Sequence, residues 1–166
     1  MINPASVRRR RALLTSTAAG VAAVDLLIKA VAERRLRSPV DLGLIQLQLV
    51  HNSGVAFSVG QALPAWTVIA LTASICVALL AYAWRAVPHS RPVARLALGV
   101  VLGGAAGNLV DRATDGVVTD YLHTGWFPTF NLADTLIVVG AATLTLTHLA
   151  ARPGAGAEPA PKHTSR

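Results

Sequence analysis

The sequence predicts an all-α polytopic membrane protein with four transmembrane helices and a small extracytoplasmic β element. Three observations support this fold class. The 166 residues are 53% hydrophobic, and the mean hydropathy of +0.52 is too high for an ordinary soluble domain of this length. Four apolar runs follow one another along the chain. The arginines are concentrated at the ends of these runs, as expected for segments that cross a bilayer.

The first apolar run, at 12–32, directly follows four arginines. A cleavable signal peptide also begins in this way, and the letters AAGVAA supply small residues for cleavage. We favour a retained helix, because the run continues for a bilayer length and carries Asp25 and Lys29 four residues apart on one helical face. This pair is either an ion pair that steadies the helix bundle or part of a site.

Between the first and second runs the chain becomes polar, and Ile45, Leu47 and Leu49 alternate with glutamines in the period of a half-buried strand. We therefore predict a small β element at about 40–60, outside the membrane. The letters NSGVAF follow from Asn52, and taken alone they are consistent with a bare turn.

The remaining spans are predicted at 64–82, 96–110 and 132–151. Three glycines recur at intervals of four in the third span: Gly99, Gly103 and Gly107. Such a stripe of small residues favours close approach of another helix. Residues 1–151 then form a single membrane domain, and the tail at 152–166, rich in Pro, Gly and Ala, is predicted to be disordered.

Charge and cysteine content exclude several classes of protein. The net charge of +7 does not indicate nucleic-acid binding, because the arginines form no patch interleaved with aromatic residues. The single Cys76 excludes a disulfide framework and a CxxC motif, and its apolar surroundings are typical of a small buried side chain. Ten Arg and Lys residues flank the side that carries both termini, so the positive-inside rule predicts cytoplasmic termini. Four lie on the other side: Arg34, Arg35, Arg37 and Arg112.

Two aspartates, Asp120 and Asp134, stand on either side of an aromatic, Pro-containing loop within residues 118–135. Asp134 comes three residues after Asn131 and directly precedes the fourth apolar run, so we predict its carboxylate at a membrane boundary. An ionised Asp costs about 2.5–3.5 kcal/mol at the centre of a bilayer helix, so an acid at the helix end needs a partner or a function. If the loop acid Asp120 is that partner, the two carboxylates share one proton, which is the chemistry of aspartic proteolysis.

The third span ends in Asn108, Asp111 and Arg112, which fall at i, i+3 and i+4 on one helical face. We expect these polar groups to converge at the membrane surface. A simpler interpretation is a helix-end salt bridge between Asp111 and Arg112. Asp115 and Gly116 then form a solvated turn, to which we assign no chemistry.

Other functions fit parts of the sequence. A zinc protease is disfavoured, because the five histidines contain no HExxH motif. A Ser-Lys hydrolase would pair Lys29 with Ser53 or Ser58, since a desolvated lysine can act as a base. A small proton-coupled transporter would use the acids of the spans as a relay, although the sequence has neither a repeat nor broken midplane helices.

Five separated motifs resemble those of the bacterial lipoprotein signal peptidases, also called signal peptidase II. The motifs are Asp25 with Lys29, NSGVAF at 52–57, GGAAGNLVDR at 103–112, VTDY at 118–121 and FNLAD at 130–134. Their order and spacing fit this family from the first span to the fourth. Two departures are small: Thr119 stands where a second valine is frequent, and the loop at 123–129 that would close over a substrate is short.

In this family the catalytic acids are those of the VTDY and FNLAD motifs, so the resemblance implies Asp120 and Asp134 as the catalytic pair. Other motif residues are implied to bind the substrate or to order the site. They are Asn52, Gly54, Ala56, Phe57, Asn108, Asp111, Arg112, Asn131, Ala133, Asp25 and Lys29.

The implied substrate is a prolipoprotein whose lipobox cysteine carries a diacylglyceryl group, cleaved directly before that cysteine. The resemblance implies an aspartic endopeptidase of the bacterial cell membrane that needs no cofactor and no metal, is surrounded by membrane lipid and acts as a monomer. Because the diacyl chains and the signal helix are lipid-soluble, we expect a site at the extracytoplasmic boundary, which receives them laterally and draws water from outside.

Overall fold

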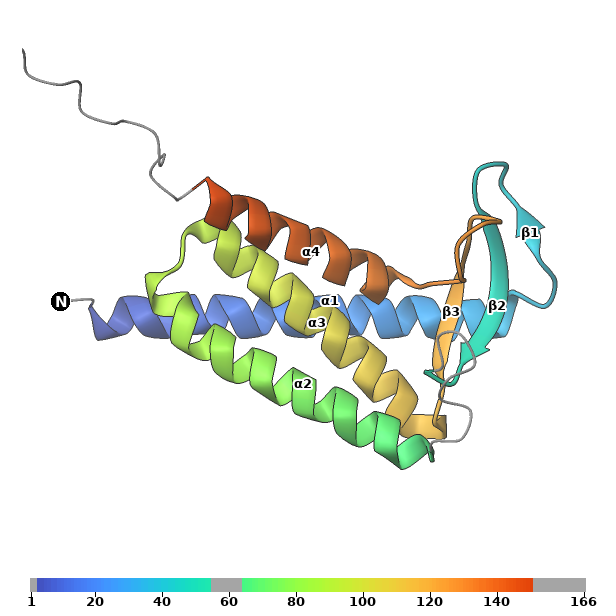
Figure 1. Ribbon diagram of the computed structural model, residues 1–166, viewed down its shortest axis with the longest axis horizontal. Helices are drawn as coiled ribbons and strands as arrows, with labels where there is room; N and C mark the ends of the chain where they lie inside the picture. The colour runs from blue at the N-terminus through green and yellow to red at the C-terminus, as the bar shows by residue number, and fades with distance from the viewer. Residues whose placement is uncertain (1–2, 55–63, 151–166) are drawn as a thin grey trace, which may run out of the picture.

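The structure of the protein, a computed structural model, describes residues 3–54 and 64–150 (Figure 1). These residues form a helix bundle with a small sheet at one end, which confirms the predicted fold class. The helices are α1 (Pro4–Arg35), α2 (Ala65–Ala86), the short 3₁₀ helix η2 (Val87–His89), α3 (Pro92–Asp115) and α4 (Leu132–Leu149). The strands are β1 (Val40–Asp41), β2 (Gln46–Asn52) and β3 (Val118–His123).

Within the described chain, α1 to α4 are each long and apolar enough to cross a bilayer, so this is a multi-pass membrane protein. Their outer surfaces are apolar: Leu27, Leu71 and Val138 are 62–67% exposed. The start of α1, the turn between α2 and α3 and the end of α4 lie at one end of the bundle, opposite the sheet (Figure 1). We refer to these two ends as the arginine end, with Arg8–Arg11, Arg85, Arg91 and Arg95, and the sheet end.

Helix α1 is longer than its predicted span of 12–32, because the four arginines continue the helix beyond the apolar run. It begins at Pro4 and is capped by Asn3, whose side chain accepts a hydrogen bond from the main-chain N–H of Ala5 at 2.9 Å. At 1.5 Å per residue, its 32 residues span about 48 Å, more than the hydrocarbon thickness of a bilayer. Polar residues of α1 therefore reach both boundaries of the membrane.

The other helices also differ from their predicted spans. Helix α3 runs well past 96–110 and stops at Gly116, which has the φ of +91° that suits a helix C-terminus. Helix α2 ends at Ala86 rather than at 82, and α4 ends at Leu149. Hydropathy marks only the residues in hydrocarbon, whereas helical hydrogen bonding continues to the next cap.

Helix α3 is the central helix, and its glycines allow its neighbours to approach closely. A Cβ atom at Gly103 would lie 2.6 Å from the main-chain oxygen of Ala18, and Gly99 also faces α1. Gly104 faces α4, where a Cβ atom would lie 2.8 Å from the main-chain oxygen of Ala133. The predicted stripe of small residues therefore packs against α1, and one further glycine, Gly104, allows α4 to approach α3 closely.

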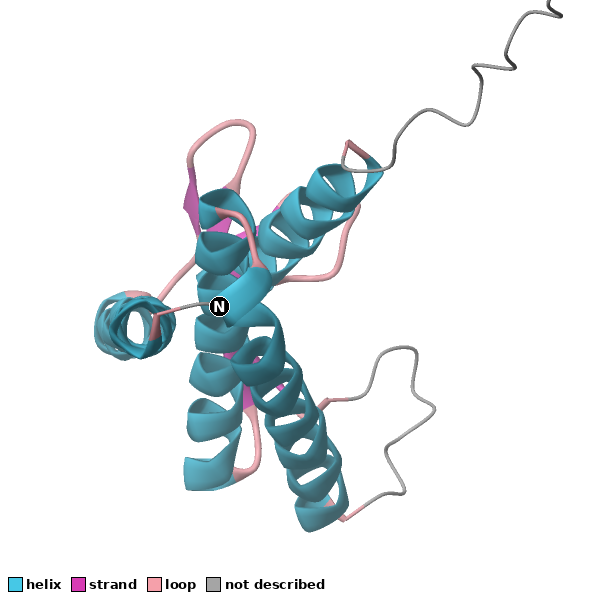
Figure 2. Cartoon of the chain, turned by 90° about the vertical axis from the view of Figure 1, so that its left-hand side faces the viewer, coloured by secondary structure: helices cyan, strands magenta, loops and turns pink. Residues whose placement is uncertain are grey.

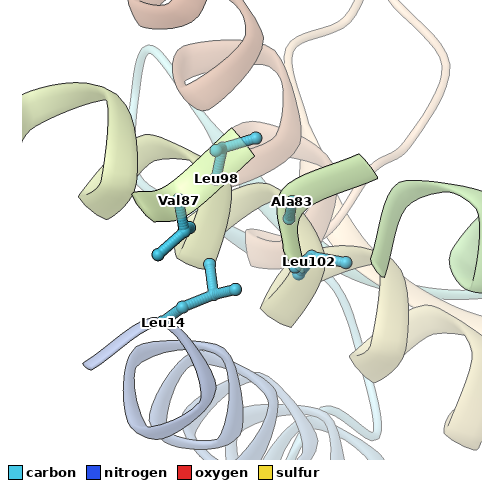
Figure 3. Packing of buried hydrophobic residues seen from close by; sticks show 5 residues of the cluster. All are labelled: Leu14, Ala83, Val87, Leu98 and Leu102. Atoms are coloured by element: carbon cyan, nitrogen blue, oxygen red, sulfur yellow. The ribbon is translucent and has the colours of Figure 1, made fainter. Parts of the chain in front are cut away.

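Apolar packing holds the bundle together toward the arginine end. The buried cluster comes from α1, α2, η2 and α3 and comprises Leu14, Ala83, Val87, Leu98 and Leu102 (Figure 3). Seen from this end, α1 points along the line of sight and the other helices slant past it (Figure 2). The buried polar side chains of the described residues, in contrast, lie toward the sheet end: Asp25, Lys29, Arg112, Thr119, Asp120 and Asn131.

The sheet is antiparallel with the order β1-β2-β3, and Val50 on β2 pairs with Asp120 on β3. The predicted β element at 40–60 corresponds to β1 and β2, and its last part lies outside the described residues. The prediction that Asp120 is a loop acid is wrong, because it lies within a strand. Residues 118–121 are all buried, so they lack the polar-apolar alternation that predicts a strand.

Candidate active site

The N-terminus of α4 fixes Asp134 through the local sequence FNLAD. Asn131 is the N-cap residue, and its side-chain oxygen accepts a hydrogen bond from the main-chain N–H of Asp134 at 3.0 Å. In return, Oδ2 of Asp134 accepts a hydrogen bond from the main-chain N–H of Asn131 at 3.2 Å. This capping box turns the carboxylate of Asp134 back toward the start of the helix, where the helix dipole favours a negative charge.

The second acid, Asp120, is joined to the first through the same asparagine. Nδ2 of Asn131 donates to Oδ1 of Asp120 at 2.7 Å and also to Oδ1 of Asn108 at 3.1 Å. Nδ2 of Asn52 donates to the other oxygen of Asp120 at 2.9 Å. Asp120 is only 1% exposed, and Asn131 is fully buried. The two predicted acids are therefore brought to one place and separated by a single side chain.

Burial is the main cause that raises the pKa of Asp120 to about 6, and the negative charge of Asp134 acts in the same direction. The hydrogen bonds from Asn52 and Asn131 act in the opposite direction, because they stabilise the ionised carboxylate. Asp120 therefore exchanges its proton much closer to neutral pH than an ordinary aspartate. A carboxyl group with this property can act as an acid or as a base near neutral pH.

Lys29 forms the charged centre of the site. Its Nζ lies 2.9 Å from Oδ2 of Asp25 and 3.1 Å from Oδ2 of Asp111, and it donates to Oδ1 of Asn108 at 2.6 Å. The simpler prediction of a salt bridge between Asp111 and Arg112 is wrong, since Asp111 pairs with Lys29 across the α1–α3 interface. With Asn108 held in this way, its amide donates to Oδ1 of Asp134 at 2.8 Å.

Asp25 connects α1 to the first turn of α4. Its Oδ1 accepts a hydrogen bond from the main-chain N–H of Ala133 at 2.9 Å, and both residues are fully buried. Ala133, predicted as a site residue, thus contributes through its backbone. Gly107 leaves room for the Asp25 carboxylate, because a Cβ atom at this position would lie only 2.8 Å from Oδ2 of Asp25. The third glycine of the predicted stripe therefore accommodates a carboxylate rather than a helix backbone.

The NSG turn after β2 directs Asn52 toward Asp120. The Oδ1 atom of Asn52 accepts a hydrogen bond from the main-chain N–H of Gly54 at 2.8 Å, and its main-chain oxygen accepts one from Arg112 at 3.2 Å. Gly54 has a φ of +87°, and a Cβ atom there would lie 2.9 Å from a methyl group of Val68. The turn therefore holds Asn52 in its contact with Asp120. The predicted site residues Ala56 and Phe57 lie outside the described residues.

Sequence reasoning missed Glu33 and the polar role of Thr119. The Thr119 hydroxyl donates to Oε1 of Glu33 at 3.0 Å, and its main-chain N–H donates to Oδ2 of Asp111 at 2.8 Å. Glu33 follows Lys29 by four residues and lies on the same helical face, a spacing that could have identified it. These contacts fix β3, and with it Asp120, against α1 and α3.

A cavity of about 550 Å³ lies beside Asp134. Its walls are largely apolar and come from the loop after β3 and from α4: Thr124, Trp126, Phe127, Thr129, Phe130, Thr135, Val138 and Val139. Trp126 is 85% exposed and Val138 67% exposed, so the cavity opens on the lipid-facing surface of α4. An apolar molecule in the membrane can therefore approach the Asp134 carboxylate from the side.

Comparisons with known proteins agree with the resemblance in the motifs. Residues 17–150 match the family model described as signal peptidase (SPase) II. The chain is 39% identical over 140 residues to a lipoprotein signal peptidase of Dehalococcoides mccartyi, covering 81% of this chain and 86% of that relative. It is 35% identical to the lipoprotein signal peptidase of Mycolicibacterium smegmatis, covering 95% and 73%.

The fold is also similar to that of solved structures. Two structures of a bacterial membrane enzyme, determined by the in meso method at 1.9 and 2.3 Å resolution, superpose with TM-scores of 0.72 and 0.70. They cover 85% and 84% of this chain, and 95% and 88% of the solved chains. At 22% sequence identity, this likeness concerns the fold.

Proposed function

Because the chain belongs to the signal peptidase II family, whose members cleave signal peptides from lipoproteins, we propose that it is an aspartic endopeptidase. Asp120 and Asp134 are its catalytic pair. Its substrate is a prolipoprotein whose lipobox cysteine carries a diacylglyceryl group, and the peptide bond directly before that cysteine is cut. The reaction needs no metal or organic cofactor, and the enzyme works as a monomer.

The observation that carries this proposal is the link between the two acids through Asn131. Its side-chain nitrogen donates to Asp120 at 2.7 Å, and its side-chain oxygen accepts a hydrogen bond from the main-chain N–H of Asp134. A structural N-cap alone does not require a second buried carboxylate next to it. Burying Asp120 at 1% exposure makes its charge costly, as the raised pKa of about 6 indicates. Such a cost is expected where a carboxyl group must exchange a proton during a reaction.

In the proposed mechanism, the two carboxylates hold one proton between them. The ionised member removes a proton from a water molecule, and the resulting hydroxide attacks the scissile carbonyl carbon. The protonated member donates a hydrogen bond to the carbonyl oxygen, on which negative charge develops. As the tetrahedral intermediate collapses, the C–N bond breaks and a proton returns to the nitrogen, which leaves as the amine of the lipidated cysteine.

The surrounding polar groups hold this pair in position. Asn108 donates to Asp134, and Asn52 donates to Asp120, so each carboxylate has one amide partner besides Asn131. Lys29 lies among three oxygen atoms, two of which belong to carboxylates. An ammonium group neutralised in this way is a poor general base, which argues against the Ser-Lys alternative.

The apolar cavity beside Asp134 supports a lipidated substrate. The cavity is bordered by Phe127 and Phe130 and opens toward Val138 on the lipid-facing side of α4. The acyl chains and the apolar signal helix both remain in the bilayer, so the substrate enters sideways and does not have to leave the membrane. Water reaches the pair from the sheet end.

Charge supports the proposed orientation in the bacterial membrane. The arginine end carries Arg8–Arg11 and the basic turn between α2 and α3, and the acids gather toward the sheet end. By the positive-inside rule, the arginine end faces the cytoplasm, together with both termini. The catalytic pair then lies at the extracytoplasmic face, where lipoproteins are processed.

The test uses purified protein and two lipobox peptides that differ only in the diacylglyceryl group on cysteine. We expect cleavage directly before the cysteine of the lipidated peptide, no cleavage of the unlipidated peptide, and no effect of a metal chelator. Cleavage of both peptides alike would contradict the lipid requirement. Loss of activity in the chelator, restored by added metal, would contradict the aspartic mechanism.

Substitutions separate this mechanism from the Ser-Lys alternative. Asp120→Asn and Asp134→Asn should each lower the cleavage rate by on the order of 10³-fold, because neither amide can exchange a proton. Ser53→Ala should keep most of the activity, as should Asp41→Asn, which removes an exposed carboxylate on β1. The opposite pattern, with only Ser53→Ala inactive, would favour a serine nucleophile.

A further inference from the structure

Within the described residues, the arginine end of the bundle carries arginines but no Asp or Glu. Among the described residues, the stretches 3–24, 64–110 and 135–150 contain no Asp or Glu at all. These stretches include the whole arginine end of the bundle and carry its arginines. Within the part of the chain that the structure describes, no carboxylate neutralises these arginines, so this end is suited to bind an anionic molecule.

A groove between α1 and α2 leads up to these arginines. It consists of two adjoining cavities of about 570 and 610 Å³, which share Thr15 and Trp84 in their walls. The first has a mostly apolar surface, to which Leu80 and Ala81 of α2 contribute, and Arg85 is its one charged lining residue. The second is bordered by Arg8 and Arg11 of α1. The groove is therefore apolar along one part and cationic at its end.

Arg11 is fixed in this groove before any ligand binds. Its guanidinium lies 4.6 Å from the centroid of the Trp84 ring, and its NH2 donates to the main-chain oxygen of Trp84 at 3.3 Å. Its Nε is buried and has no hydrogen-bond partner within the described part of the chain. An arginine held by stacking loses little conformational freedom when it binds an anion.

We propose that this groove binds an anionic phospholipid of the surrounding bilayer. The phosphodiester accepts hydrogen bonds from Arg8 and Arg11, and one acyl chain lies along Leu80 and Ala81. Guanidinium groups bind phosphate oxygens well, and juxtamembrane arginines are attracted to anionic leaflets. The apolar part of the groove selects a lipid over a soluble phosphate. This proposal concerns the end of the bundle opposite the candidate active site and does not depend on the proposed function.

Trp84 serves as the reporter in the test. In a Trp66→Phe/Trp126→Phe background, the full chain is reconstituted in vesicles with increasing fractions of brominated phosphatidylglycerol or brominated phosphatidylcholine, and the quenching of Trp84 fluorescence is measured. We expect half-maximal quenching at a roughly tenfold lower fraction of phosphatidylglycerol, which corresponds to one or two arginine–phosphate interactions. Equal quenching by the two lipids would overturn the proposal.

Two pairs of substitutions test whether the named arginines are responsible. Arg8→Gln/Arg11→Gln should remove the preference for phosphatidylglycerol. Arg9→Gln/Arg91→Gln removes the same charge at the same end but outside the groove, so it should keep the preference. A preference that survives the first pair, or is lost equally in both, would overturn the assignment to this groove.

A third substitution and a competitor test the apolar part. Ala81→Phe fills the groove without changing any charge, and it should weaken quenching by phosphatidylglycerol at least threefold. Soluble glycerol phosphate at millimolar concentration should leave the quenching unchanged, since it lacks an acyl chain. Displacement of the lipid by glycerol phosphate would show a site for free phosphate and would overturn the lipid assignment.

Discussion

The side-chain amide of Asn131 donates to Oδ1 of Asp120 at 2.7 Å, while the same residue caps α4, the helix whose first turn contains Asp134. One residue therefore has two separable tasks. The cap needs only an acceptor oxygen for the main-chain N–H of Asp134. The link to Asp120 needs a side chain that carries an N–H donor and is long enough to reach the carboxylate. Substitutions can remove either task alone.

The first prediction separates these tasks. Asn131→Ser keeps an N-cap oxygen but is too short to reach Asp120, so it should lower cleavage at least 100-fold with little change in thermal stability. Asn131→Ala removes both functions and should also cost about 1 kcal/mol of stability. Cleavage of the lipidated peptide and the unfolding temperature in detergent are the two measurements. If Asn131→Ser remains fully active, the asparagine does nothing more than cap α4.

The second prediction concerns the pH dependence of stability. Asp120 has a pKa of about 6 in the folded chain, against 3.8 for an ordinary aspartate, so between these values the folded state holds a proton that the unfolded chain has lost. The stability contributed by this proton is complete below pH 3.8 and is lost as the pH rises through 6. At pH 8 the ionised form should therefore cost up to about 3 kcal/mol.

Asp120→Asn has no such proton, so its unfolding temperature should exceed that of the unsubstituted protein at pH 8, and this advantage should shrink as the pH falls to 4. The control is Asp41→Asn, which changes an exposed carboxylate and should leave the pH dependence as it was. Unfolding temperatures measured in detergent from pH 4 to pH 8 provide the test. An advantage of Asp120→Asn that is constant with pH would contradict the raised pKa.

The sequence predicted the membrane helices well because their apolar runs reflect a single physical requirement, the exclusion of charge from hydrocarbon. It located Asp25 with Lys29, and Asn108 with Asp111, because helical spacing alone places such pairs on one face. These predictions needed no knowledge of how the helices pack. The ends of the helices were less predictable, since they depend on caps such as Asn3 and Gly116, which lie in polar sequence.

What the sequence did not predict depends on contacts between elements. Strand β3 is buried on both faces, so it lacks alternation, and Asp120 was therefore expected in a loop. The partner of Asp111 was expected to be its neighbour Arg112, but the packing of α3 on α1 brings Lys29 to 3.1 Å. The shared role of Asn131 likewise appears only when β3 and α4 are placed side by side.

The third prediction tests the charged centre of the site. Lys29→Met leaves Asp25 and Asp111 without their shared cation, and breaking a buried pair in this way costs about 3–5 kcal/mol. Adding Asp25→Asn should recover part of this loss, because one uncompensated charge is removed. The double variant should therefore unfold at a higher temperature than Lys29→Met alone. A further loss in the double variant would show that the pair is not coupled.

An exposed comparison is the pair of His51 and Glu33, which is an ion pair only while the imidazole is protonated; the two side chains lie 3.3 Å apart and are 50% and 44% exposed. Solvent screens this interaction, so His51→Gln should change stability by less than about 1 kcal/mol. The contrast between the two pairs checks that burial, rather than charge alone, makes Lys29 important. Similar losses for both pairs would contradict this explanation.

The fourth prediction uses two glycines on neighbouring helices. A Cβ atom at Gly107 would lie 2.8 Å from Oδ2 of Asp25, whereas nothing lies within 4 Å of a Cβ atom at Gly20. Gly107→Ala must displace the carboxylate from Lys29 or from the main-chain N–H of Ala133, so it should lower the unfolding temperature. Because Asp25 fixes the first turn of α4, cleavage should also fall by on the order of tenfold or more.

Gly20→Ala is the matched control, because it adds the same methyl group to a helix without meeting any neighbour. It should stabilise α1 by about 0.5–1 kcal/mol through its higher helix propensity and leave cleavage unchanged. Since alanine favours the helix at both positions, a loss at Gly107 must come from its contact with Asp25. If both variants gained stability and remained active, the carboxylate would have another position available, and the close approach of α1 to α3 at Gly107 would not be required for the site.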